Sequence, residues 1–281
     1  MKSCGEVVSL TFGDQGENHV GMETVGSMVD EGLGFNIDDF KSYRATFKTA
    51  GYMVEIYHLN RLVSPPRDDS EEAYVMVVRN GAHFFLAQHD KTDTDLLHEM
   101  NSFDWDRQYY CTRRSKVLNK HARANVCFGH DNRAPDYENK KGRIVAYDDV
   151  PSLKIIKEGM ETLLGPKCTN LICEGNRYFD LKKCGIGWHG DAERRKVVAF
   201  RLGEDMDLHF NWFERHKPFG ETLKLTLNSG DMYFMSEKAV GWDWKKSSKT
   251  TLRHSAGKRG SSFICQKRFT KKRKKRVSVE G

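Results

Sequence analysis

The second half of the chain is a succession of short apolar segments separated by turn residues, and this pattern limits the fold more than any other feature. Six segments after Gly165 have the length and the β-branched or aromatic content of strands: 169–173, 196–202, 208–213, 222–227, 232–235 and 261–265. Turn-forming residues separate them at 203–204, 218–220 and 228–231. Closely spaced short strands predict a β-sandwich or a barrel, of which the double-stranded β-helix, or jelly roll, is one form.

Helical patterns flank this strand series, so we expect an α+β fold. Phe40, Tyr43 and Phe47 have helical spacing within 35–50. A strand over 53–59 follows, and Asn80-Gly81 between the apolar segments 74–78 and 83–87 predicts a β-hairpin. We expect a short acidic helix over 93–100 and a longer one over 148–165, with Pro151 in its first turn and an apolar stripe formed by Leu153, Ile156, Met160 and Leu163.

Composition excludes several classes of protein. The 281 residues suffice for one large domain or two small ones, and no apolar run approaches the roughly 20 residues of a membrane-spanning helix. The amino terminus carries acidic residues where a signal peptide needs an apolar stretch. Seven cysteines without a C-x-x-C pair fit neither a disulfide framework nor a thiolate zinc site. These features predict an intracellular protein with reduced thiols, and we expect a monomer.

The charge is divided along the chain. Residues 1–100 hold 8 Lys and Arg against 17 Asp and Glu, whereas residues 257–281 hold 10 against 1. Residues 105–143 are also basic and contain interleaved aromatic side chains, which suits phosphate and base binding, although a surface loop whose aromatics pack into the core is the alternative. The run 271–276 is either a nuclear-import signal, a phosphate clamp or a solubilising tail, and it predicts a nuclear location if the host is eukaryotic.

One short motif suggests metal chemistry. His189-Gly190-Asp191 is the only His-x-Asp in the chain, and in an extended segment residues two apart point to the same face. A third ligand would complete a 2-His-1-carboxylate set, which leaves three positions open on Fe(II). The candidates are His209, His216 and His254. We favour His254 because it follows nearly the whole strand series, whereas His209 lies in an alternating strand and His216 lies in a polar turn.

The order of several motifs resembles the AlkB-like branch of the Fe(II)/2-oxoglutarate dioxygenases. Asn176-Arg177-Tyr178 is followed by GIGWHGDAE, by VVAFRLG, by LTLNSGDMYFM and then by His254. The resemblance implies a jelly-roll core with flanking helices over 91–270, in which 105–145 is a nucleotide-recognition lid. Residues 1–90 would then be an α/β extension of unknown role, and 271–281 a basic tail.

The resemblance also implies roles for individual residues. His189, Asp191 and His254 would hold iron, and Asn176 and Tyr178 would contact 2-oxoglutarate. An arginine after His254 would pair with the far carboxylate, because that buried group needs a bidentate, permanently charged partner. Arg268 is the first choice, with Arg273 or Arg259 as alternatives, since the lysines at 271 and 272 interrupt the family's pattern.

For the substrate, the family places two acids after the metal aspartate, whereas this chain has Ala192-Glu193, so Glu193 alone could serve. Arg194 and the two basic residues after it would line a substrate groove or form a charged strand edge. Arg123 and Tyr137, from the expected lid, complete the candidate substrate residues.

The implied function is oxidation of a methyl or alkyl group on a nucleic-acid base, in DNA or RNA, with 2-oxoglutarate and O2 as co-substrates and ascorbate as a possible support. A flipped or single-stranded base would enter the site. Three alternatives stay open: a thymine or 5-methylcytosine hydroxylase of the JBP/TET kind, a dioxygenase acting on protein, and a nucleic-acid-binding protein without catalysis.

Overall fold

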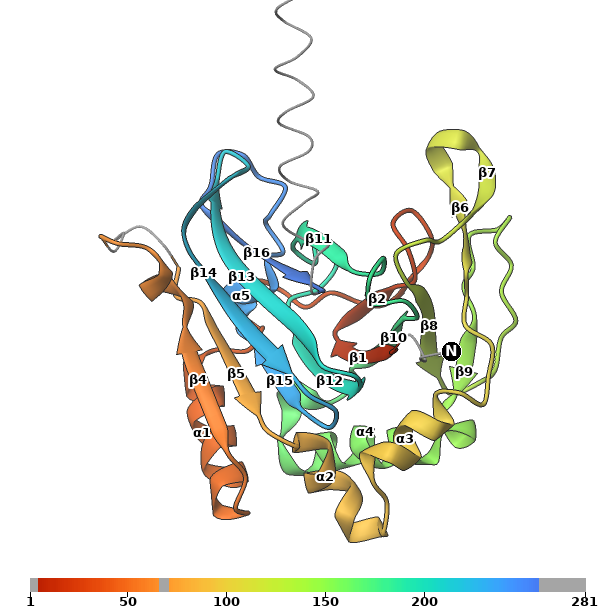
Figure 1. The fold of residues 1–281 in the computed structure, drawn as a ribbon, viewed down its shortest axis with the longest axis horizontal. Helices are drawn as coiled ribbons and strands as arrows, with labels where there is room; N and C mark the ends of the chain where they lie inside the picture. The colour runs from red at the N-terminus through yellow and green to blue at the C-terminus, as the bar shows by residue number, and fades with distance from the viewer. Residues whose placement is uncertain (1–4, 66–70, 258–281) are drawn as a thin grey trace, which may run out of the picture.

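Strands from both halves of the chain pair into two main sheets in the computed structural model, which describes residues 5–65 and 71–257 (Figure 1). Within these ranges the larger sheet has eight strands, in the order β4 (Val54–His58), β5 (Tyr74–Val78), β15 (Met232–Met235), β12 (Val197–Gly203), β1 (Val7–Gly13), β10 (Ile172–Tyr178), β8 (Ala124–Gly129) and β9 (Ile144–Ala146). The smaller sheet has the order β11 (Ile186–His189), β16 (Thr251–Ala256), β13 (Met206–Glu214) and β14 (Lys217–Leu227). Neighbours in both sheets are antiparallel, apart from the parallel pair β8 and β9.

The remaining elements are short. Two hairpins stand apart from the main sheets: β2 (Gln15–Glu17) with β3 (Thr24–Gly26), and β6 (Gln108–Cys111) with β7 (Lys116–Asn119). The α-helices are α1 (Ile37–Thr49), α2 (Gly81–Leu86), α3 (Asp93–Glu99), α4 (Pro151–Leu163) and α5 (Glu237–Val240). Short 3-10 helices are η1 (Leu59–Leu62), η2 (Ala87–His89), η3 (Thr112–Arg114), η4 (Tyr147–Asp149) and η5 (Pro166–Cys168).

The larger sheet lies between two apolar clusters, which gives a three-layer arrangement. On β1, Val8, Leu10 and Phe12 belong to a cluster that also contains the buried faces of α1, α2, α3 and α4. The opposite face of β5, β12 and β15 packs against β13, β14 and β16 through a second cluster centred on Phe210 and Trp212. Because side chains alternate along a strand, the other residues of β1 and β10 face away from the helices. The fold is therefore mixed α and β and rich in strands.

The expected helices form for local reasons that the structure bears out. Asn36 caps α1 by accepting from the backbone N–H groups of Asp38 and Asp39, and the Asp39 carboxylate accepts from the Asn36 N–H in return. Pro151 starts α4, whose buried face contains Leu153, Ile156 and Met160. The stripe ends there, because Leu163 is 47 % exposed. The helix expected over 93–100 is α3, which begins at a capping box on Thr92.

The hairpin predicted at Asn80-Gly81 is wrong in its second half. Asn80 has the left-handed conformation that suggested a turn, with φ 55°, but the chain continues into α2 instead of a strand. Ala82, Phe85 and Leu86 are buried at helical spacing. Gly81 fits there because a Cβ would lie 2.5 Å from the Cβ of Met232. The burial of these α2 side chains in the core therefore favours a helix, although Asn80-Gly81 alone favours a hairpin.

The predicted strand series is largely confirmed, with one turn misplaced. The strand expected over 232–235 is β15, and those expected over 196–202, 208–213 and 222–227 are β12, β13 and β14. The strand expected over 169–173 begins only at Ile172 and continues to Tyr178 as β10. Residues 218–220 lie inside β14 and do not form a turn. The turn is made instead by Arg215 and His216, with φ 48° and 65°. The segment expected over 261–265 lies outside the described residues.

Residues 1–90 do not form a separate extension. Strand β1 lies inside the larger sheet, where Ser9 is opposite Arg201 of β12 on one side and Asn176 of β10 on the other. Strands β4 and β5 continue the same sheet beyond β15. The acidic first third of the chain is thus part of the sheet that holds the cavity described below. Among the described residues, no helix is both long and apolar enough to cross a membrane.

Candidate metal centre

Two histidines and one aspartate from distant parts of the chain converge at one point. Strand β11 ends at His189, Asp191 follows two residues later, and β16 pairs with β11 so that His254 is opposite His189. The Asp191 Oδ1 lies 3.5 Å from Nε2 of His189 and 3.6 Å from Nε2 of His254. One potential ligand atom from each residue lies within 4.8 Å of the other two. The three residues predicted as metal ligands are therefore brought together, and they could bind a metal ion.

The protonation states in this group suit a cation. Burial, followed by the nearby His254 ring, lowers the pKa of His189 to about 3, so this imidazole is neutral at neutral pH. Burial alone would raise the pKa of Asp191, but the charge of Arg194 and a hydrogen bond from His254 outweigh it and hold this pKa below its usual range. A neutral imidazole and an ionised carboxylate are the forms that bind metal.

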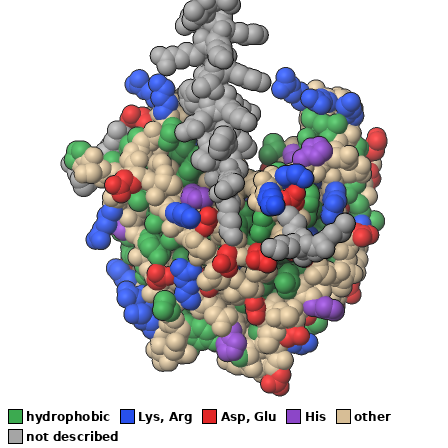
Figure 2. All heavy atoms as spheres, in the orientation of Figure 1, with side chains coloured by type: hydrophobic (Ala, Val, Ile, Leu, Met, Phe, Trp, Pro, Cys, Tyr) green, Lys and Arg blue, Asp and Glu red, His purple; other side chains and the backbone are tan. Residues whose placement is uncertain are grey.

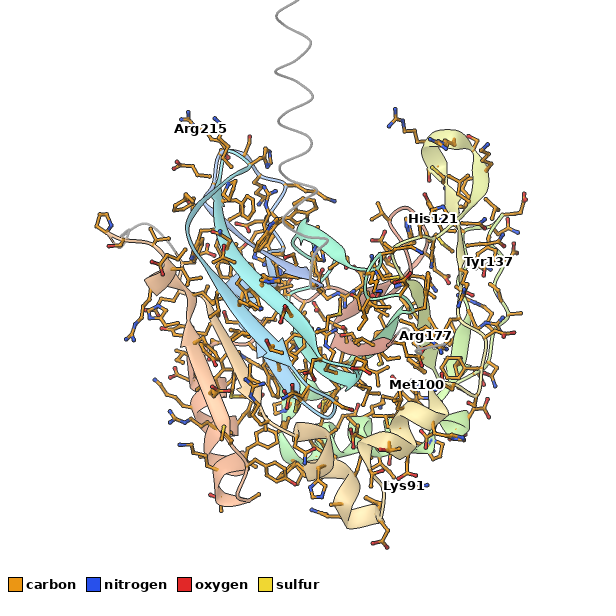
Figure 3. All side chains as sticks on the ribbon, viewed as in Figure 1. Lys91, Met100, His121, Tyr137, Arg177 and Arg215 are labelled. Atoms are coloured by element: carbon orange, nitrogen blue, oxygen red, sulfur yellow. The ribbon has the colours of Figure 1, made fainter. Side chains whose placement is uncertain are left out.

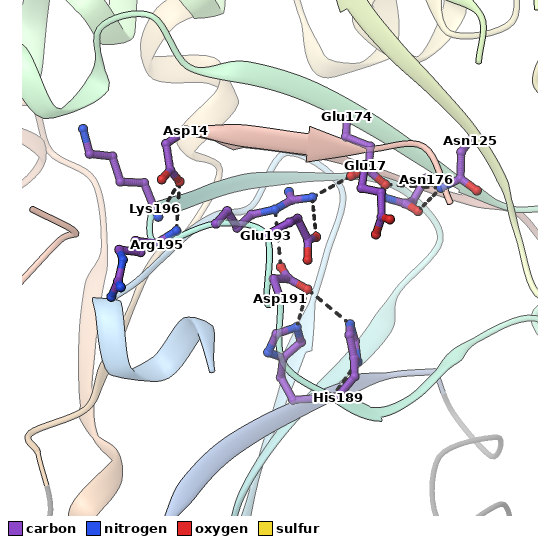
Figure 4. A network of polar contacts seen from close by, with 12 residues as sticks. Asp14, Glu17, Asn125, Glu174, Asn176, His189, Asp191, Glu193, Arg195 and Lys196 are labelled. Carbon is purple, nitrogen blue, oxygen red and sulfur yellow. Dashed lines mark hydrogen bonds and ion pairs between the residues drawn. The ribbon is translucent and has the colours of Figure 1, made fainter. Parts of the chain in front are cut away.

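Neighbouring backbone groups fix the orientation of the ligands. The Nδ1 of His189 lies 2.8 Å from the carbonyl of Gly187 and 3.1 Å from that of His254, so its Nε2 is directed to Asp191 (Figure 4). The Asp191 N–H donates to the carbonyl of Val240 at 3.0 Å. A Cβ on Gly190 would lie 2.1 Å from the Gly241 carbonyl oxygen, which explains the glycine between the two ligands.

The metal group opens on a cavity of about 910 Å³. This volume exceeds that of a small co-substrate and falls at the upper end of the range for ligand pockets. Its walls come from both main sheets and from the first third of the chain. Its lining includes several aromatic side chains: Tyr178, Trp188, Phe213, Tyr233 and Trp244.

Most of the predicted site residues line this cavity, including Asn176, Tyr178, Glu193, Arg194 and Arg123. The Arg123 Nε donates to Oδ1 of Asn176 at 2.6 Å, and the Asn125 amide also donates to that oxygen. Burial, followed by the charge of Asp191, raises the pKa of Glu193 to about 7.

Tyr137 does not reach the cavity, contrary to its predicted role in substrate binding. Its hydroxyl donates to Asp106 at 2.9 Å, and it lines a separate shallow pocket with Trp105 and Arg177. Figure 3 places Tyr137 toward the outer edge of the molecule. The buried Asp106 carboxylate also accepts hydrogen bonds from the Arg143 N–H and from the Asn18 side chain. Tyr137 is therefore part of a hydrogen-bond network that lies away from the cavity.

The basic run after Glu193 neither lines a groove as a unit nor forms an exposed edge. Arg194 is 3 % exposed in its side chain and lies 2.7 Å from Glu174, 3.0 Å from Glu193 and 3.8 Å from Asp191. The backbone N–H groups of Arg195 and Lys196 both donate to Asp14 at 2.9 Å (Figure 4). Arg194 therefore holds the carboxylates beside the metal group in place, and is already paired before any substrate binds.

The other candidate histidines stay apart from the metal group. His209 lies on β13 opposite Ser255 and does not line the cavity. His216 lines the cavity, but its Nδ1 lies 2.7 Å from Nη2 of Arg253. Arg259, Arg268 and Arg273 lie outside the described residues.

Several cavity residues were missed by the sequence analysis. Ser9, Thr11, Glu17 and His19 come from the first third of the chain, and Arg201 and Tyr233 come from β12 and β15. The signal was present in the alternation of 7–12, where Val8, Leu10 and Phe12 are apolar and the residues between them include Ser9 and Thr11. The alternation alone does not show that this strand lies inside a sheet, which follows from its pairing with β10 on one side and β12 on the other.

Basic side chains gather at two tips above the body of the molecule (Figure 2). Arg113, Arg114 and Lys116 are exposed where β6 and β7 meet, and Arg215 and Lys217 are exposed where β13 and β14 meet. Figure 3 labels Arg215 at the second of these tips. The expected lid segment thus includes a basic hairpin.

The fold and the site define a mixed α and β protein with a candidate metal centre of two histidines and one aspartate. Uncharacterized protein R156 of Acanthamoeba polyphaga mimivirus is 39 % identical to this chain over 258 residues, which cover 92 % of this chain and 98 % of the viral protein. The chain therefore belongs to the family of that mimivirus protein. No family model matches the chain.

Proposed function

We propose that the protein is an Fe(II)- and 2-oxoglutarate-dependent dioxygenase that oxidises a methyl or alkyl group on a nucleic-acid base. The observation that carries the proposal is the convergence of His189, Asp191 and His254 at the wall of a large cavity. Two packed sheets that share an apolar cluster beside this group support a jelly-roll core.

The donor set fits iron. Two imidazoles and one carboxylate occupy three positions and leave the others for a co-substrate and O2. Bound Fe(II), with 2-oxoglutarate and O2, would supply the oxidation of a C–H bond. In the overall balance, one O2 and one 2-oxoglutarate give succinate and CO2, and the second oxygen atom enters the substrate as hydroxyl. A hydroxylated N-methyl group then leaves as formaldehyde, whereas a hydroxylated C-methyl group stays.

The chain's own residues orient the reactants. Arg194 fixes Asp191 through its charge, and the carbonyls of Gly187 and His254 fix the ring of His189. Asn176 and Tyr178 line the cavity with the metal group, which supports their proposed contact with 2-oxoglutarate. His254 and Tyr178 are the more deeply buried members of the site, at 5 % and 4 % exposed, whereas the side chains of His189 and Asp191 are 22 % and 17 % exposed to the cavity.

A nucleobase is the substrate class that the cavity supports best. The aromatic walls offer stacking surfaces. Glu17 and Glu193, which line the cavity, can accept hydrogen bonds from an amino or imino group of a base. The two basic tips supply positive charge for the phosphates on either side.

The test incubates the full chain with Fe(II), ascorbate, 2-oxoglutarate and oligonucleotides that carry single methylated bases, in single- and double-stranded DNA and RNA. We expect succinate to accumulate together with a demethylated or hydroxymethylated nucleoside, measured by mass spectrometry, and we expect His254→Ala to form neither. A stable hydroxymethyl base selects C-methyl hydroxylation. Succinate formation on peptides, with none on any oligonucleotide, would move the substrate out of this class.

A further inference from the structure

Arg201 is a buried arginine without an anionic partner among the described residues. It lies on β12, is 1 % exposed and lines the cavity. Within 5–65 and 71–257, the polar contact of its guanidinium is Nη1 with the sulfur of Met206 at 3.5 Å, and Nε has no partner. Arg194, equally buried, has three carboxylates around it. A buried cation without an anion is strongly destabilising. The burial of Arg201 therefore suggests that the cavity binds an anionic ligand.

Hydroxyl groups lie beside Arg201 on the same face of the larger sheet. Ser9 of β1 is directly opposite Arg201, and Val7 is opposite Tyr178 in the same strand. Tyr233 lies on β15, opposite Ala199 of β12. Side chains two apart on a strand share a face, and Ser9, Tyr178, Arg201 and Tyr233 all line the cavity.

These hydroxyls are hydrogen-bond donors at neutral pH. Burial raises the pKa of both Tyr178 and Tyr233, so both phenols stay protonated. The charges of Arg201 and Asp191 both act on the same two phenols. Arg201 and both tyrosines line the same cavity as the metal group.

We propose that Arg201 binds the carboxylate of the co-substrate that is remote from the metal, with Ser9, Tyr178 and Tyr233 as its neighbours. The inference rests on the proposed function and assigns to β12 the role that the family resemblance implies for Arg268, Arg273 or Arg259. A planar guanidinium forms two parallel hydrogen bonds to a carboxylate, so this site selects a 2-oxo dicarboxylate over a 2-oxo monocarboxylate. It also gives the first third of the chain a part in the site, through Ser9.

The experiment measures binding of 2-oxoglutarate to the full chain loaded with Mn(II), by calorimetry, for the wild type and Arg201→Met. Methionine replaces the aliphatic part of the arginine side chain and removes the buried charge. The ligand-free variant should therefore unfold at the same temperature as the wild type or at a higher one. We expect a Kd for 2-oxoglutarate about 10- to 100-fold higher, as for loss of a charge-assisted hydrogen bond, with Mn(II) affinity unchanged. Arg44→Met, an exposed arginine on α1, is the matched control and should bind like the wild type.

Three further measurements separate this inference from its rivals. Arg201→Lys should recover part of the affinity, and pyruvate, which lacks the second carboxylate, should bind the wild type and Arg201→Met equally weakly. The assignment is overturned if Arg201→Met binds 2-oxoglutarate as tightly as the wild type. It is also overturned if Arg268→Ala or Arg273→Ala loses affinity while Arg201→Met does not. If the wild type binds no 2-oxoglutarate, the proposed function fails. In that case the anion site is tested with glutarate. The site is supported if glutarate raises the unfolding temperature of the wild type but not that of Arg201→Met, and it is refuted otherwise.

Discussion

At the residue scale, the candidate metal centre depends on side chains that are not ligands. Arg194 is neutralised by three carboxylates and stabilises the ionised form of Asp191. Arg201 is equally buried but unneutralised among the described residues, and it faces the same cavity. Two arginines seven positions apart thus have different roles because only one of them has anionic neighbours. Their residue type alone did not distinguish them.

The metal ligands give the first prediction. Replacing His254 by alanine removes one of the three donors, and we expect the affinity for Mn(II) or Fe(II) to fall by more than about 100-fold, beyond the effect of losing a group that only orients a ligand. Calorimetric titration with Mn(II) measures this change. His209→Ala is the matched control, since this histidine lies outside the cavity, and equal losses in both variants would contradict the assignment.

Lys120 gives a pH-dependent prediction. It is 8 % exposed, and burial lowers its pKa to about 8 from the usual value near 10.5, despite the attraction of Asp106. Between these two pH values the unfolded chain binds the proton and the folded chain does not, so folding becomes more favourable as pH rises. Relative to Lys120→Met, the wild type should gain on the order of 3 kcal/mol of unfolding free energy from pH 8 to 10.5. Chemical denaturation at several pH values measures the unfolding free energy of both proteins. The same pH dependence in the wild type and in Lys120→Met would refute the prediction.

At the element scale, tight backbone contacts between short elements position the ligands. The loop after β11 passes so close to Gly241, at the end of α5, that only glycine fits at position 190. The same loop is tied by Asp14, next to β1, which accepts from the N–H groups of Arg195 and Lys196. The metal aspartate is therefore held between α5 and the N-terminal strand.

Gly190→Ala tests this close approach. The added methyl would collide with the Gly241 carbonyl and displace His189 relative to Asp191, so we expect metal affinity to fall by about 10- to 100-fold although no ligand is removed. Gly187→Ala, in β11, is the control because its Cβ would meet nothing within 4 Å. The same Mn(II) titration applies, and an unchanged affinity in Gly190→Ala would show that the loop can move without disturbing the ligands.

Element by element, the sequence predicted those elements whose own residues contain the signal. Helix α1 has a capping box and α4 has a proline start, and both formed close to their expected bounds. The segment after Asn80 has a hairpin signal in two residues and a helical burial pattern over the next six, and burial decided the outcome. Strand β1 shows an alternation of apolar and polar residues over 7–12, but the sequence does not show where it pairs, because its partners β10 and β12 lie far along the chain.

At the scale of the whole molecule, the chain does not divide at residue 90. The larger sheet places β1 between β10 and β12, with β5 next to β15, so its core includes residues from both ends of the described chain. The cavity likewise takes residues from both parts. The acidic first third and the part that contains the candidate metal group therefore form one structural unit.

Expression of residues 91–281 alone tests this unity. The fragment lacks β1, β4 and β5, so β10 and β12 lose their shared partner and the apolar cluster loses Val8, Leu10 and Phe12. We expect no cooperative thermal transition by circular dichroism and no Mn(II) binding. A cooperative transition like that of the full chain would instead support an independent domain beginning near residue 91.

The sequence by itself predicted the three residues of the candidate metal group, because His189 and Asp191 share a face of one extended segment and the strand series favoured His254 as the third ligand. It also determined the helices that have their own caps and stripes. Only the tertiary structure decided that the first third supplies a central strand, that Tyr137 lies away from the cavity, and that Arg201 faces into it. Each of these depends on which strands pair across more than a hundred residues, and local sequence patterns do not contain that information.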